Sequence, residues 1–152
     1  AKPATHDDVA ARQDAWAERG PHNWISLEVD PMSRIDNINK VLRSLQSGTP
    51  DVEAAALISE DGLTIASALP QHMDEMRLGG MSATLHILGN KAATELERGK
   101  TEEVLVRGKN GYVVMQTAAP GTVLLLLTQR EAKLGLIFMD MARAISELKK
   151  VL

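Results

Sequence analysis

The strongest constraint in this sequence is a proline-free stretch, residues 71–98, that predicts one long helix. At about 1.5 Å per residue it would be roughly 40 Å long, about the width of a small domain. Apolar residues recur at helical spacing on two separate sides of it. The first stripe consists of Met81, Leu85, Leu88, Ala92 and Leu96, and the second of Met73, Met76, Gly80, Ala83 and Ile87.

Two apolar stripes on one helix need two separate surfaces to pack against. We expect the first stripe to cover a sheet of the same chain, and the second to pack on other parts of the monomer, to form a weak Met-rich surface, or to meet a second copy. The dimer is favoured because contiguous exposed apolar patches usually mark partners, and because Gly80 and Ala83 are small enough for a close helix crossing. Between the stripes we expect a polar, exposed side formed by Ser82, His86, Asn90 and Glu97.

Three glycines interrupt the helical pattern of this stretch. Gly79, Gly80 and Gly89 each lower helix propensity by about 1 kcal/mol relative to alanine. They indicate either a break in the helix or a packing reason for glycine at these positions.

Composition excludes several classes of protein. The 152 residues fit one domain with a short extension, and 44% hydrophobic residues suffice for an ordinary core. Aromatic residues make up only 3%, so we expect an aliphatic, Met-rich core. A net charge of -3 argues against nucleic-acid binding, which requires a basic surface.

Cysteine content and hydropathy bear on the compartment. The chain has no cysteine, which excludes disulfides and thiolate chemistry and suits a reducing compartment. No apolar run approaches the ~20 residues of a membrane span, and the first residues lack the apolar segment of a signal peptide. We therefore expect a cytoplasmic protein without direct membrane insertion.

Residues 1–30 are predicted to be a partly flexible N-terminal extension. Residues 9–19 have the pattern of a short helix, which Gly20-Pro21 would end. Trp24 lies in an apolar cluster just before the next helix, and we expect it to dock rather than remain in water.

Periodicity and turn residues predict the element order α-β-β-α-β-β-β-α. A first helix begins at Asp30-Pro31 and ends at Gly48. The Asp-Gly and Asn-Gly dipeptides mark hairpin turns. Strands are expected at 52–59, 63–68, 103–107, 112–117 and 122–128, and a last helix at 131–152. Its apolar stripe is Leu134, Phe138, Met141, Ile145, Leu148 and Leu152.

This order predicts an α+β sandwich built on one antiparallel five-stranded sheet. The long helix would cover one face and the first and last helices the other. The run from Val123 to Leu127 is apolar on both sides, which is typical of a central strand that is covered on both faces.

We find no catalytic constellation in the sequence. Gly99-Lys100-Thr101 resembles the end of a phosphate-binding loop, but Thr94 replaces the required earlier glycine and the triplet follows a helix. The four histidines lack metal-ligand spacing, and the serines lack a nucleophile-elbow context. We expect no enzyme activity, cofactor or metal.

Three segments make the chain similar to the roadblock/dynein-light-chain family. Residues 52–62, VEAAALISEDG, match the family's first hairpin with its Asp-Gly turn. Residues 105–127 match its meander with a leucine-rich last strand, and Leu134-Gly135 matches its Leu-Gly signature. The resemblance covers about residues 32–152, so we expect a roadblock-like domain at 31–152 with a roadblock/profilin-like fold.

The resemblance implies a non-enzymatic homodimer that regulates a small Ras-like GTPase. In the family arrangement the long helices pack together, the third strands join into one sheet, and the long-helix face binds the GTPase. The implied dimer interface comprises Met76, Gly80, Ala83, Ile87, Thr94, Val104 and Val106. The implied GTPase-facing residues are Glu75, Ser82, His86 and Asn90.

Two other classes stay open at this point. One is a structural scaffold or dynein-light-chain-like subunit that does not affect GTP hydrolysis. The other is a small-ligand sensor, because similar folds hold ligands between sheet and helix. The shortage of aromatic residues and of convergent polar groups argues against the sensor.

Overall fold

The structure is a computed structural model that describes residues 31–152. Residues from Ile35 onward form one compact unit. The expectations for residues 1–30, including the helix at 9–19 and the docking of Trp24, lie outside the described residues.

The predicted order of helices and strands is confirmed within this described part. Strand ends agree with the prediction to within two residues, because turn dipeptides mark them in the sequence. The elements are α2 (Pro31–Gly48), β1 (Val52–Ser59), β2 (Thr64–Ala68), α3 (Glu75–Glu95), β3 (Glu103–Gly108), β4 (Gly111–Ala119), β5 (Thr122–Gln129) and α4 (Leu134–Lys149).

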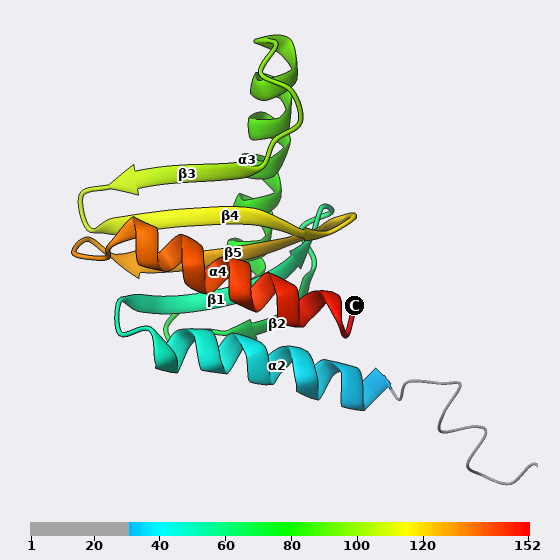
Figure 1. Ribbon diagram of the computed structural model, residues 1–152, viewed down its shortest axis with the longest axis vertical. Coiled ribbons are helices and arrows are strands. Elements are labelled where there is room, and N and C mark those ends of the chain that lie inside the picture. Colours follow the sequence, from blue (N-terminus) through cyan, green and yellow to red (C-terminus); the bar gives the residue numbers. More distant parts are fainter. Residues whose placement is uncertain (1–30) are drawn as a thin grey trace, which may run out of the picture. The chain divides into compact units, whose positions relative to one another are not determined.

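The five strands form one antiparallel sheet in the order β2-β1-β5-β4-β3 (Figure 1). The apolar strand β5 is central, as its two-sided hydrophobic run predicted. β2 and β3 are the edges, so β3 has a neighbour on one side only among the described strands.

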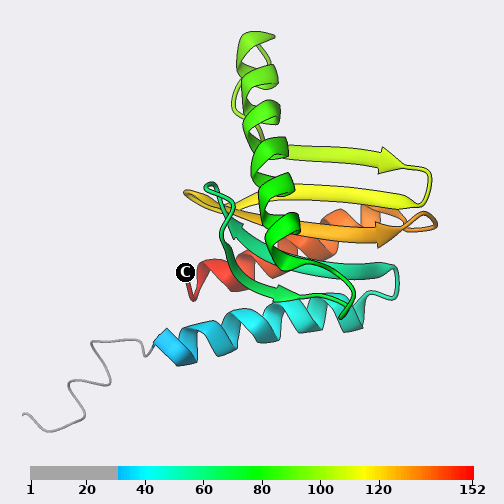
Figure 2. The same cartoon turned by 180° about the vertical axis from the view of Figure 1, so that it is seen from behind.

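Alternating side chains of the central strands supply two cores. Leu57, Leu124 and Leu126 pack with α2 and α4 on one face. Ile58 and Leu125 pack with Leu78 and Leu85 of α3 on the other. Figures 1 and 2 show α2 and α4 on one face of the sheet and α3 on the other, which confirms the predicted layers.

Helix α4 is rotated relative to the predicted stripe. Its deepest residues are Ile137, Met141, Ala144 and Leu148, whereas Leu134, Phe138 and Ile145 are half-buried and Leu152 is exposed. The reason is that α4 packs on α2 as well as on the sheet. Thr49, in the loop after α2, donates to a carboxylate oxygen of Asp140 in α4 (2.7 Å).

Helix α3 is shorter than the predicted 71–98. It starts at Glu75 because Asp74 caps it, with the side chain accepting from the backbone N–H groups of Met76 and Arg77. Glu97 and Gly99 adopt positive φ just after its end. Its C-terminal part extends past the edge strand β3 (Figures 1 and 2).

Candidate protein-binding surface

The side of α3 that faces the sheet is the side predicted to be polar and exposed. Ser82 is 3% and His86 7% exposed, and Gly79 is buried with them. Small residues occupy this side because the helix crosses the β1–β2 turn at very short range. A Cβ on Gly79 would overlap the carbonyl oxygen of Gly62. The prediction of an exposed polar side is therefore wrong for these residues.

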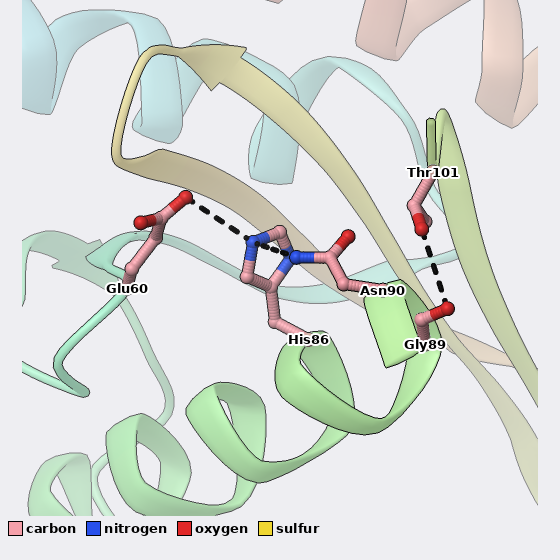
Figure 3. A network of polar contacts seen from close by, with 5 residues as sticks. All are labelled: Glu60, His86, Gly89, Asn90 and Thr101. Carbon is pink, nitrogen blue, oxygen red and sulfur yellow. Dashed lines mark hydrogen bonds and ion pairs between the residues drawn. The ribbon is translucent and has the colours of Figure 1, made fainter. Parts of the chain in front are cut away.

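His86 belongs to a polar network between α3 and the β1–β2 turn (Figure 3). Its Nε2 lies 3.4 Å from Oε1 of Glu60 and 3.2 Å from Nδ2 of Asn90. This nitrogen either donates an N–H to Glu60 or accepts from Asn90, depending on the tautomer. Nearby, the Thr101 hydroxyl donates to the Gly89 carbonyl (3.3 Å). The network explains how a histidine is tolerated beneath the helix.

All four predicted GTPase-facing residues have polar partners within the chain, His86 among them. Ser82 donates to the Leu78 carbonyl within the helix (2.7 Å), and half-buried Asn90 contacts His86. Glu75 is exposed, although its carboxylate accepts from Ser67 (2.7 Å). Since Ser82 and His86 present almost no surface, we withdraw them as partner contacts.

We expected the first stripe of α3 to pack on the sheet, and most of it does not. Only Leu85 of this stripe packs into the sheet core. Met81 and Leu88 are 59% and 58% exposed, and Ala92 and Leu96 are also exposed. The reason is the orientation of α3: with the Gly79 side on the sheet, the first stripe lies along one flank of the helix.

The second stripe lies along the opposite flank. Ala83 is half-buried, and its Cβ is 3.3 Å from where a Cβ on Gly62 would be, in the β1–β2 turn. Met76 and Ile87 are 87% and 59% exposed, and a Cβ on Gly80 would meet nothing within 4 Å. Between the flanks an outer polar strip of Arg77, Thr84, Lys91 and Glu95 is exposed.

The edge strand β3 lies beside the first stripe. Val104 packs in the same cluster as Leu85, and a Cβ on Gly89 would lie 2.6 Å from a Val104 methyl. Met81 and Leu88 neighbour Leu85 at helical spacing, while Val106 is exposed on β3. We call Met81, Leu88, Val104 and Val106 the edge surface.

The predicted dimer interface is therefore split between two flanks. Val104 and Val106 lie at the edge surface, whereas Met76, Gly80, Ala83 and Ile87 lie on the flank above the β1–β2 turn. Thr94 is exposed near the end of α3. Contact of Val104 and Val106 with a second copy stays a prediction, and we revise the prediction for Met76, Gly80, Ala83 and Ile87, which lie on the other flank.

One groove of the described surface lies between α2 and α4. It measures about 320 Å³ and is lined by side chains of both charges, among them Lys40, Arg143, Asp140 and Glu147. Residues 31–152 contain no group of three His, Asp or Glu placed to hold a metal. None of the helices described is long and apolar enough to cross a membrane.

Comparison with known proteins identifies the family. The sequence model of the Roadblock/LC7 domain matches residues 38–128, more than half of the chain. This chain belongs to the Roadblock/LC7 domain family. Two uncharacterized proteins of Methanocaldococcus jannaschii are each 32% identical to it over 112 residues, covering 74% of this chain and 96% of the relative.

Solved structures share this Roadblock/LC7 fold. A Roadblock/LC7 domain from Streptomyces avermitilis has a TM-score of 0.69 at 23% identity, covering 74% of this chain and 94% of that chain. Myxococcus xanthus MglB has a TM-score of 0.71 at 21% identity, covering 77% and 88%. A structure of MglB in a tetrameric arrangement has a TM-score of 0.71 at 20% identity, covering 78% and 90%.

A Schizosaccharomyces pombe profilin shares the fold more distantly, with a TM-score of 0.53 at 11% identity, covering 74% of this chain and 97% of that chain. The predicted roadblock/profilin-like architecture is thereby confirmed. The Roadblock/LC7 match includes the first hairpin and the meander that carried the resemblance, while Leu134-Gly135 lies beyond it.

Proposed function

We propose that this chain is a non-catalytic, homodimeric regulator of a small Ras-like GTPase. The observation that carries the proposal is that α3 exposes apolar residues on both flanks, one of them beside the edge strand β3. One helix thus offers two apolar surfaces for two different partners. Membership of the Roadblock/LC7 family and similarity to MglB support the partner class.

The edge surface is the proposed dimer contact. An edge strand with exposed apolar side chains readily pairs with another strand, and a two-fold dimer uses the same patch on both copies. Because α3 extends past β3 (Figure 2), its C-terminal part would lie over the sheet of the second copy. A stable interface of this kind buries on the order of 1,200–2,000 Å² in total.

The opposite flank of α3 and the outer polar strip are the proposed GTPase contact. Met76, Gly80 and Ile87 are exposed in the single chain and lie outside the edge surface, and the exposed Arg77 and Lys91 belong to the adjoining polar strip. An apolar patch with a polar rim is typical of a regulated, reversible interface. Of the residues implied by the resemblance, Glu75 stays in this surface and Ser82 and His86 leave it.

Regulation would act through the switch loops of the GTPase. A protein that binds one nucleotide state more tightly shifts the population toward that state.

The test is a titration of this protein into the small GTPase that is encoded nearest to its gene. The GTPase is loaded with GDP or with a non-hydrolysable GTP analogue, and its hydrolysis rate is measured in parallel. Met139→Arg, an exposed change on α4, is the matched control for Met76→Arg on α3. We expect the α3 variant alone to lose binding.

The outcomes separate the candidate functions. Affinity that depends on the nucleotide, or a changed hydrolysis rate, supports regulation. Equal affinity for both nucleotide states contradicts regulation and supports the scaffold. Absence of binding to any small GTPase, together with uptake of a small ligand, would replace the proposal with the sensor.

A further inference from the structure

We infer that β3 pairs with β3 of a second copy in one register, centred on Leu105, in which Glu103 of each copy forms an ion pair with Arg107 of the other. The inference rests on the proposed dimer. It adds the register of the strand pair and the two ion pairs that favour a second copy over other partners. Its experiments are chosen so that a wrong register and an absent dimer give different results.

Side chains of β3 alternate between the two faces of the sheet. Leu105 is opposite Val114, which belongs to the core beneath α2 and α4. Glu103 and Arg107 therefore lie on that face with Leu105. Val104 packs with Leu85 of α3, so Val104 and Val106 lie on the opposite face, at the edge surface.

Symmetry reduces the possible registers to a few. A two-fold axis perpendicular to the sheet makes the two strands antiparallel and keeps both α3 helices on the same face. Residues opposite each other then share a face of the sheet. The axis must therefore lie midway between the two copies of one residue, which can be Val104, Leu105 or Val106. Within the six-residue strand, centres at Leu105 and Val106 each keep five residues paired, and a centre at Val104 keeps three.

Only the Leu105 centre matches every side chain with a suitable partner. It places Leu105 opposite Leu105, Val104 opposite Val106, and Glu103 opposite Arg107, the last two pairs occurring twice. A centre at Val104 would place Glu103 opposite Leu105. A centre at Val106 would place Arg107 opposite Leu105 and Val104 opposite Gly108. Opposite charges directly across a strand pair stabilise it, and unmatched pairs do not.

Contacts within the chain hold both charged side chains close to the strand. The Glu103 carboxylate accepts from the Gln116 side-chain amide (2.8 Å). The Arg107 guanidinium lies 6.0 Å from the centre of the Tyr112 ring. Neither residue takes part in an ion pair among residues 31–152, so both charges are available to a second copy.

The sequence of β3 is thus self-complementary, and the partner that it fits is a second copy of this chain. A related chain that carries these two charges exchanged, with a basic residue opposite Arg107 and an acidic residue opposite Glu103, would meet repulsion at both ends of the strand pair. Such repulsion is an effective way to reject wrong partners.

Charge reversal tests the ion pairs. Glu103→Arg and Arg107→Glu, each alone, place like charges opposite each other twice, and we expect the dimer dissociation constant to rise about tenfold or more. Mixing the two single variants restores both pairs in a heterodimer, and the double variant restores them in a homodimer. Sedimentation velocity at several concentrations measures this. Mixing that rescues nothing would overturn the inference.

Cysteine cross-linking tests the register directly, because the natural chain contains no cysteine. Opposite Cα atoms in an antiparallel strand pair are alternately about 5.5 Å and about 4.5 Å apart, and both distances are within disulfide range. We expect Leu105→Cys to cross-link with itself under oxidation, and Val104→Cys to cross-link only when mixed with Val106→Cys.

The cross-linking results keep the two proposals apart. Self-cross-linking of Val104→Cys or Val106→Cys in place of Leu105→Cys would overturn the register and leave the dimer standing. A natural chain that is monomeric at micromolar concentration, with no cross-link in any variant, would overturn the dimer itself.

Discussion

Gly79 is the residue that decides how α3 lies on the sheet. A side chain at this position would overlap the carbonyl oxygen of Gly62 in the β1–β2 turn. The adjacent Gly80 has open space where a Cβ would be. Two consecutive glycines thus have different roles, one in packing within the chain and one on the exposed flank.

We predict opposite effects for alanine at these two positions. Gly79→Ala forces the helix away from the turn and should lower the free energy of unfolding by about 1–3 kcal/mol. Gly80→Ala should raise it by about 1 kcal/mol through helix propensity. Urea denaturation of both variants at one protein concentration measures the difference. Equal midpoints would show that the close approach has no energetic consequence.

At the scale of elements, the rotation of α4 changes which residues hold it on the sheet. Met141 is fully buried and Ile145 half-buried, although both belong to the predicted stripe. Met139, two residues before Met141, is exposed on the other side of the helix.

We therefore predict that Met141→Ala lowers the free energy of unfolding by about 2–5 kcal/mol, through lost burial and a cavity. Met139→Ala, the matched control, should change it by no more than about 0.5 kcal/mol. Ile145→Ala should fall between them. Thermal or urea unfolding provides the measurement, and a larger loss for Ile145→Ala than for Met141→Ala would contradict the rotation.

At the scale of the whole molecule, the two flanks of α3 separate self-association from partner binding. The edge surface includes Met81, one helical turn before Leu85, and the opposite flank includes Met76, on the stripe whose Ala83 lies at the β1–β2 turn. Both methionines are exposed in the described chain, so a charge at either position disturbs no core.

We predict that Met81→Arg yields a folded monomer and that Met76→Arg stays dimeric but loses the GTPase. A buried, unpaired charge at an interface is strongly destabilising, and each arginine would be buried in only one of the two contacts. Light scattering after size exclusion reports the oligomeric state, and circular dichroism verifies the fold. A monomeric Met76→Arg and a dimeric Met81→Arg would exchange the roles of the two flanks.

The sequence by itself determined the elements and their order. The Asp-Gly turn at 61–62 and the Asn-Gly turn at 110–111 delimit two hairpins, and the doubly apolar run 123–127 predicted the central strand. These signals are local, since a turn needs particular backbone angles and a strand a period of two. The family resemblance depends on the same local signals, because its motifs are short hairpin and strand segments.

Only the tertiary structure decided which side of α3 is buried. Periodicity placed an apolar stripe of α3 on the sheet, yet Gly79, Ser82 and His86 lie there. The reason is steric: the helix crosses the turn at Gly62 at a range that only small side chains allow. The larger His86 is accommodated beside Glu60 and Asn90. Such a contact between a helix and a turn joins residues far apart in the chain, so the spacing of apolar residues along one helix or strand cannot predict it.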